Sequence, residues 1–127
     1  MIARRHLGVL RRYAELPDDE FLRNAEALGA AKYAFVVMIE AAVSIASHLC
    51  AKKLSKAPIS QRDGFLILGD AGLLPQDLAG ELGRMAGFRN LLVHGYGQVD
   101  NRLMLAIMRE HLADVESFIS GILELDG

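Results

Sequence analysis

Apolar residues recur at spacings of three and four along most of the chain, which is the period of an amphipathic helix. The pattern predicts a first helix over residues 2–16, with Ile2 and Leu10 on its apolar side. Helical pattern resumes at residue 19 and runs to about residue 54, with Asp18 as the expected cap. Asn24 or Gly29 divides this stretch into a short helix and a long one, which ends before Pro58.

The pattern in the second half of the chain predicts three more helices. Ser60 and Asp63 have the spacing of a capping box, which opens a short helix that stops near Gly72. A longer helix starts at Pro75 and stops at Gly95. Asp100 or Asn101 caps a last helix, whose apolar stripe comprises Met104, Met108, Leu112, Val115, Ile119 and Ile122. We therefore expect an all-α fold, an antiparallel up-and-down helical bundle of four main helices plus short helices.

Residues 33–51 form the most apolar stretch of the chain. Glu40 and His48 interrupt it, and a carboxylate in the middle of a membrane span is costly. The stretch therefore predicts a helix buried within the protein and no membrane association. Because residues 35–39 are all apolar, this helix is hydrophobic on more than one side. We predict a homodimer whose interface covers the excess; a central helix in a monomer is the alternative.

Composition adds limits to this picture. The chain has 127 residues, of which 52% are hydrophobic and 24% charged, so it predicts one folded domain over residues 1–127 rather than a disordered chain. The single cysteine, Cys50, excludes an intramolecular disulfide and a Cys-rich zinc site, and we expect it to be a small buried hydrophobe. No apolar segment typical of a secretory signal follows the first residues, which favours a cytoplasmic location.

One polar cluster near the end of the fifth predicted helix has the residue types of a reactive site. Arg89 carries a charged fork suited to phosphate, Asn90 can donate and accept hydrogen bonds, and His94 can transfer a proton near neutral pH. Arg89 and His94 are five residues apart, so they converge only if the helix loosens at Gly95 or a second subunit completes the site. These residues suggest a phosphate-handling site; an ordinary helix end with a capping histidine is the alternative.

The segment over residues 89–96 resembles the R-X4-H-X-Y motif of the HEPN superfamily, in its HepT-like (DUF86) branch. The likeness covers nearly the whole chain, because other parts of the family pattern are also present. These parts are Arg4-Arg5-His6, Ile39-Glu40-Ala41-Ala42 followed by His48-Leu49, and a helix that ends near Gly72-Leu73-Leu74.

The resemblance implies a metal-independent RNA endonuclease, the toxin of a toxin–antitoxin pair. Its partner is a minimal nucleotidyltransferase antitoxin, and no cofactor is expected. Arg89 and His94 would be the catalytic pair, Asn90 would assist, and Tyr96 would receive AMP groups from the antitoxin. Two alternatives stay open: a non-catalytic nucleotide- or partner-binding subunit of a two-component nucleotidyltransferase, and a plain helical dimerisation domain.

RNA cleavage by such an enzyme does not require a metal ion. RNA supplies its own 2′-OH nucleophile, so a nuclease needs a base, an acid and a cation for the phosphorane charge. The sequence shows no acidic cluster or His/Asp set at metal-ligand spacing, and no metal site is predicted. Two motifs facing each other across a dimer would supply two histidines and two arginines.

The net charge is −2, so any RNA contact needs a local basic patch. The first predicted helix offers one, with no acidic residue before Glu15; a solvated helix face or a surface for an acidic antitoxin is the alternative. Glu40 and His48 share a face of the long helix, where they line the cleft or form a satisfied polar spot in the core or dimer interface. His6 and His111 are expected at the surface. The arginines of the basic helix are Arg4, Arg5, Arg11 and Arg12.

Overall fold

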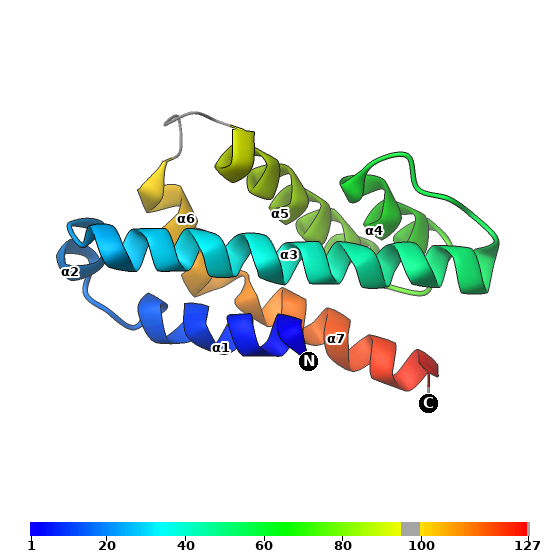
Figure 1. Cartoon of the computed structure of the whole chain (residues 1–127). Coiled ribbons are helices and arrows are strands. Elements are labelled where there is room, and N and C mark those ends of the chain that lie inside the picture. Colours follow the sequence, from blue (N-terminus) through cyan, green and yellow to red (C-terminus); the bar gives the residue numbers. More distant parts are fainter. Residues whose placement is uncertain (95–99, 127) are drawn as a thin grey trace.

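A computed structural model describes residues 1–94 and 100–126, with side chains as far as residue 122. All regular structure within these ranges is helical (Figure 1). Four longer helices and three shorter ones confirm the predicted bundle of four main helices plus short helices. In chain order they are α1 (Ile2–Ala14), α2 (Asp18–Leu22), α3 (Ala25–Leu54), α4 (Gln61–Asp70), α5 (Gln76–His94), α6 (Asn101–Glu110) and α7 (Leu112–Asp126).

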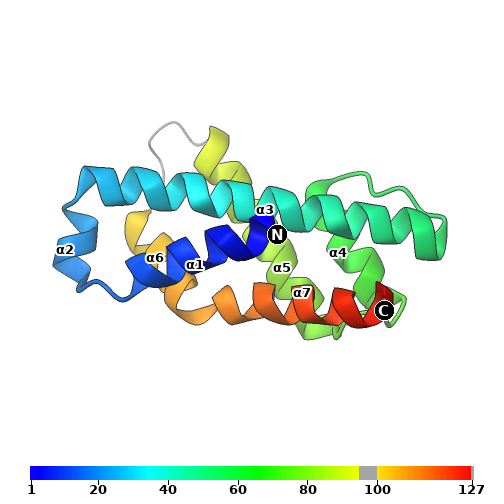
Figure 2. The same cartoon turned by 60° about the horizontal axis from the view of Figure 1, so that its bottom comes forward.

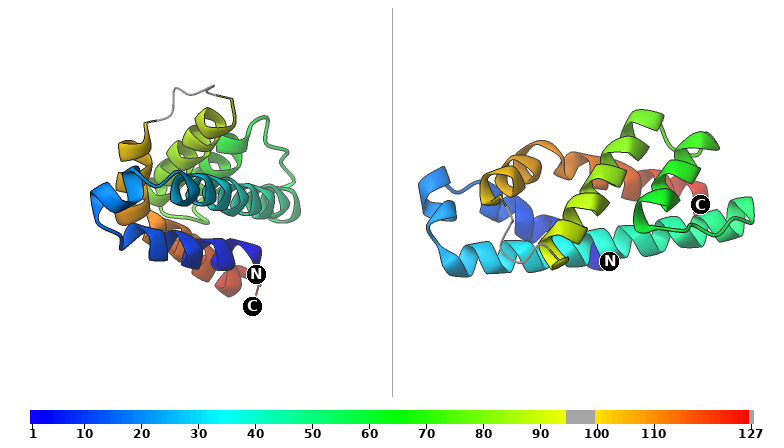
Figure 3. Two further views of the ribbon diagram at one scale, coloured as in Figure 1. Left: turned by 60° about the vertical axis from the view of Figure 1, so that its left-hand side comes forward. Right: turned by 90° about the horizontal axis from the view of Figure 1, so that it is seen from above.

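The long helix α3 runs through the whole length of the molecule, and the other helices lie along it (Figure 1). Helices α1 and α7 lie on one side of α3, and α4 and α5 lie on the other (Figure 1). Figure 2, in which the bottom of Figure 1 comes forward, shows α1 and α7 in front of α5. Helix α5 crosses α3 at a clear angle, so that its C-terminal end lies over the N-terminal half of α3 (Figure 3). This crossing places the polar cluster of α5 against the middle of the chain's most apolar helix.

Side-chain caps mark the first residues of α3 and α6. The Asn24 carboxamide accepts the N–H of Ala27 at 3.1 Å, so Asn24 and not Gly29 starts the long helix. Asp100 accepts two N–H groups at the start of α6. Both caps are among the residues predicted from the sequence.

The predicted capping box is also present at the start of α4. Ser60 Oγ accepts the N–H of Asp63 at 3.1 Å, and the Asp63 carboxylate accepts the N–H of Ile59 at 3.0 Å. The expected cap at Asp18 is wrong. Pro17 occupies that position, and the Asp18 carboxylate instead pairs with Arg109, whose guanidinium also donates to two carbonyl oxygens of the α1–α2 connection.

Two further expectations are corrected by the structure. The last helix is broken at His111 into α6 and α7, because the His111 backbone leaves the helical conformation while its ring nitrogen lies 3.0 Å from the Asp114 carboxylate. The apolar stripe continues across the break, since Met108 and Leu112 are both buried, and so the sequence reads as one helix. In α1, Ile2 is 56% exposed, and the buried face instead comprises Ala3, Leu7 and Leu10.

The core is apolar throughout the described residues, with no buried charged side chain among them. Two edge-to-face aromatic pairs join its helices, Phe35 with Phe88 and Phe65 with Phe118, each with ring centroids 5.4 Å apart. Cys50 is buried as expected. Burial, with a smaller contribution from the Asp63 carboxylate, raises the pKa of its thiol, which therefore stays protonated and unreactive at neutral pH.

Helix α3 is long and apolar enough to cross a membrane, with a mean hydropathy of 1.8 over its most apolar 18 residues. In the bundle, however, α1, α4 and α5 pack against it. One face stays open in the single chain, where Tyr33 is 68% exposed and Glu40, Ser44 and His48 are also exposed. The helix is therefore not buried all round, and an unpartnered strip runs along it beside the end of α5.

Helices α4 and α5 approach closely at a glycine, and this contact makes a testable prediction. A Cβ atom on Gly69 would lie 2.7 Å from the Cβ of Ala79. We expect Gly69→Ala to lower the free energy of unfolding by about 1–3 kcal/mol, because the two helices must separate to admit the methyl group. Urea denaturation measures the change. Gly29→Ala is the control, because its Cβ would meet no atom within 4 Å, and it should stabilise α3 by about 0.4–1 kcal/mol.

Candidate active site

Arg89 is anchored where α5 crosses α3. The preceding residue, Phe88, packs edge-on against Phe35 of α3, so the backbone at Arg89 is held close to that helix. The Arg89 side chain is 13% exposed, which is low for an arginine outside the core. Its position is thus set by core packing on one side and by polar partners on the other.

The polar partners of Arg89 are Glu40 and Asn90. One terminal nitrogen of the guanidinium pairs with the Glu40 carboxylate on α3, and the other donates to Asn90 Oδ1 at 3.0 Å. The buried Nε of Arg89 has no hydrogen-bond partner among the described residues. The fork is therefore fixed in direction by two acceptors, and each terminal nitrogen retains a second N–H that a phosphate oxygen could accept.

His94 is the last residue of α5 and is exposed. Within the described part of the chain, its imidazole makes no hydrogen bond or ion pair. Because α5 stays helical through His94, the helix does not loosen before this residue to bring His94 onto Arg89. The expected loosening at Gly95 lies outside the described residues, so both ways in which these side chains could converge stay open.

The structure therefore joins two of the predicted site residues, Arg89 and Asn90, and adds Glu40 to them. The pairing with Glu40 spans 49 positions of sequence. The sequence offered Glu40 either as a residue lining the cleft or as a polar spot in the core or dimer interface, and in the structure it is exposed and contacts Arg89. His48 lies exposed two helical turns beyond Glu40 on α3. Tyr96, the predicted site of modification, lies outside the described residues.

The basic residues of α1 form a separate surface. All four arginines are exposed, and Arg4 pairs with Glu116 of α7 at 3.0 Å. Helix α1 lies across α3 from the end of α5 (Figure 1), so within one chain these arginines do not surround Arg89. The four are Arg4, Arg5, Arg11 and Arg12.

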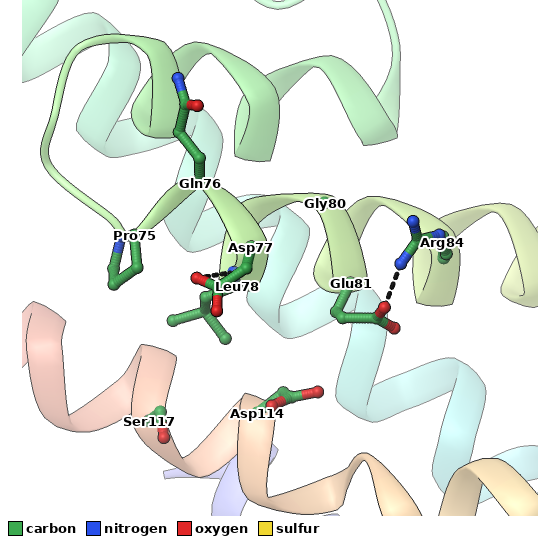
Figure 4. A pocket seen from close by; sticks show the side chains of 9 residues that line it. All are labelled: Pro75, Gln76, Asp77, Leu78, Gly80, Glu81, Arg84, Asp114 and Ser117. Carbon is green, nitrogen blue, oxygen red and sulfur yellow. Dashed lines mark hydrogen bonds and ion pairs between the residues drawn. The ribbon is translucent and has the colours of Figure 1, made fainter.

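A second group of polar side chains, missed by the sequence analysis, lies near the start of α7. Glu81, His111 and Asp114 bring donor atoms within 4.8 Å of one another, close enough to share a metal ion. Glu81 and Asp114 also line a pocket of about 650 Å3 between α5 and α7 (Figure 4). The spacing of residues along the sequence does not indicate the full group, because Glu81 is 30 positions from His111.

Comparison with known proteins places this fold and motif in a family. The model of the ribonuclease HepT-like family matches residues 3–122. The chain is 35% identical over 83 residues to the mRNA nuclease HepT of Shewanella oneidensis, an alignment that covers 65% of this chain and 62% of that nuclease. It is 28% identical over 104 residues to the tRNA nuclease HepT of Aphanizomenon flos-aquae, covering 81% of this chain and 71% of that protein.

Solved structures show the same fold. The tri-AMPylated HEPN toxin of Shewanella oneidensis, in complex with an MNT antitoxin, superimposes with a TM-score of 0.81 at 25% identity over 97% of each chain. A mutant toxin–antitoxin complex, MntA–HpeT, gives a TM-score of 0.86 at 25% identity over 97% of this chain and 92% of that one. With its all-α bundle and its Arg89–His94 motif, the chain belongs to the ribonuclease HepT-like family.

Proposed function

We propose that this protein is a metal-independent RNA endonuclease, the toxin of a cytoplasmic toxin–antitoxin pair whose antitoxin is a minimal nucleotidyltransferase. The observation that carries the proposal is the fixed guanidinium of Arg89, held by Glu40 and Asn90 five residues before an exposed imidazole. The names of the relatives support RNA as the substrate, since one is an mRNA nuclease and the other a tRNA nuclease.

The chemistry needs three functions around one phosphodiester. A base removes the proton of the 2′-OH, the 2′-oxygen attacks phosphorus, and the bond from phosphorus to the 5′-oxygen breaks. An acid protonates the leaving 5′-oxygen, which leaves a 2′,3′-cyclic phosphate and a 5′-OH end. His94 transfers protons, and Arg89 stabilises the charge that develops on the phosphorane oxygens. Asn90 assists by holding one end of the Arg89 fork.

One chain supplies a single imidazole at this place, whereas the reaction needs both a base and an acid. We therefore propose that two chains face each other and form a composite cleft at a two-fold axis. Two features of the surface next to Arg89 are available for such a contact. They are the open strip of α3, whose exposed side chains are mostly polar, and the apolar Leu91 and Val93 of α5, which are 39% and 44% exposed. The dimer would cover this surface and bring two copies of the motif together.

The antitoxin acts on Tyr96 in this proposal. Tyr96 follows His94 by two residues, so AMP groups attached to its hydroxyl would place anionic phosphate close to the motif and block it. The AMPylated state of the related Shewanella toxin in its antitoxin complex supports this step. Coexpression with the antitoxin should raise the intact mass in steps of AMP, and Tyr96→Phe should abolish the increase. An increase that persists in Tyr96→Phe would show that another residue is modified.

Glu40 acts as a positioning residue, because it touches Arg89 and not the reacting phosphate. We expect Glu40→Ala to lower kcat for RNA cleavage by about tenfold or more, since the fork loses its anchor on α3. KM should not rise, because the variant also removes a negative charge beside the RNA. Steady-state cleavage of a fluorogenic RNA measures both constants. Asp70→Ala, which removes an exposed carboxylate at the end of α4, should leave them unchanged, and a Glu40→Ala variant that raises KM alone would contradict this role.

A growth assay distinguishes the nuclease from its non-catalytic alternatives. Induced wild-type protein should arrest growth, and Arg89→Ala or His94→Ala should relieve the arrest at equal protein level. A partner-binding subunit or a dimerisation domain predicts that these variants differ from wild type only in binding or stability. Equal growth of all three strains would therefore contradict the proposed toxin.

A further inference from the structure

Three side chains from two distant parts of the sequence converge where α6 breaks into α7. His111 Nδ1 lies 3.0 Å from Asp114 Oδ2 and 3.7 Å from Glu81 Oε2. Glu81 projects from α5, while His111 is the residue at the break and Asp114 lies in the first turn of α7. Each side chain is about one-third exposed, at 29%, 33% and 31% for Glu81, His111 and Asp114.

We propose that Glu81, His111 and Asp114 bind a divalent transition-metal ion of the zinc class, with water completing the coordination. Ligands about 2.0–2.2 Å from a zinc ion lie roughly 3.3–3.6 Å from one another in a tetrahedral site. The two observed separations from His111 Nδ1, 3.0 and 3.7 Å, bracket that range, and the donor atoms of all three side chains lie within 4.8 Å of one another. One imidazole and two carboxylates suit zinc better than magnesium, which prefers oxygen ligands alone.

The surroundings of the cluster favour a cation. The pocket next to it is lined by three carboxylates, those of Asp77, Glu81 and Asp114, and by a single guanidinium, that of Arg84 (Figure 4). Arg84 pairs with Oε1 of Glu81, which leaves Oε2 directed to His111. Arg84 thereby fixes the orientation of one ligand from outside the coordination shell. The open pocket gives water access to the remaining coordination positions.

The consequence is a cross-link between α5 and the junction of α6 with α7. Glu81 lies eight residues before Arg89 on α5, a rise of about 12 Å along the helix axis. The ion is thus too far from Arg89 to take part in RNA cleavage, and the inference goes beyond the proposed function. Its expected effect is on stability, because an ion that binds only the folded chain shifts unfolding to higher temperature.

The test is titration of tag-free, chelator-treated protein with zinc chloride, followed by calorimetry and by the melting temperature. Wild type should bind one equivalent of zinc per chain and melt at higher temperature with zinc. His111→Ala should lose this binding, and Asp114→Asn, which keeps a hydrogen-bond acceptor for His111, should bind at least about tenfold more weakly. Glu110→Gln is the matched control: its carboxylate lies 4.0 Å from the other ring nitrogen, Nε2, outside the donor set, and it should bind as wild type does.

Cobalt(II) provides an independent readout. Its visible absorption should show the bands of a four- or five-coordinate ion in wild type and in Glu110→Gln, and the weak spectrum of the hexa-aqua ion in His111→Ala. Circular dichroism confirms that each variant is folded. Two results would overturn the proposal: wild type that binds no zinc at micromolar concentrations, or His111→Ala and Asp114→Asn variants that are folded and bind zinc as wild type does.

Discussion

Arg89→Ala should lower the rate of RNA cleavage by about 10²–10³-fold, which is the largest change in activity that we expect from one arginine. The variant removes the cation that stabilises the phosphorane, and it leaves Glu40 and Asn90 without their shared partner. Single-turnover cleavage of a labelled RNA measures the chemical step without the contribution of product release.

Two other substitutions make this prediction specific. Arg89→Lys keeps the positive charge but loses the planar fork, so it cannot hold Glu40, Asn90 and a phosphate together and should recover only part of the rate. Arg84→Ala removes an exposed arginine from the same helix and should cleave at the wild-type rate. A folded Arg89→Ala variant that cleaves like wild type would remove Arg89 from the mechanism.

Phe118→Ala should cause the largest loss of stability, about 3–5 kcal/mol in the free energy of unfolding. Phe118 is fully buried on α7 and packs edge-on against Phe65 of α4, so the change leaves a cavity between these helices and removes an aromatic contact. Urea denaturation followed by circular dichroism measures the loss.

The comparison for Phe118 is Ile59, which is 94% exposed. Ile59→Ala removes apolar atoms that are already in water and should change stability by less than about 0.5 kcal/mol. Phe118→Leu fills most of the space and should lose less than Phe118→Ala. If Phe118→Ala were no less stable than Ile59→Ala, the result would contradict the burial of Phe118 between α7 and α4.

The helices could be predicted from the sequence because their periodicity and their caps are local properties. Asn24, Ser60 and Asp100 each accept backbone N–H groups two or three residues further on, and the sequence shows both partners. The break at His111 could not be predicted, because the apolar stripe continues through it. At the break the imidazole contacts Asp114, and the stripe does not reveal this contact.

In the candidate site, too, local features could be predicted from the sequence and contacts between distant segments could not. Arg89, Asn90 and His94 were predicted because they belong to one short motif on one helix. The pairing of Arg89 with Glu40 depends on the angle at which α5 crosses α3, which no local pattern specifies. The cluster of Glu81, His111 and Asp114 likewise requires the turn between α6 and α7 to bring the last helix back along α5.

The central claim is that the motif on α5 cuts RNA with the RNA's own 2′-OH and without a metal. The most direct measurement is cleavage of a short RNA in excess EDTA, beside the same RNA with a single 2′-deoxyribose at the mapped cut position. Wild type should cut the first to a 2′,3′-cyclic phosphate and leave the second intact at that position, and His94→Ala should cut neither. Cleavage at the deoxyribose, or cleavage that requires added magnesium, would contradict the account.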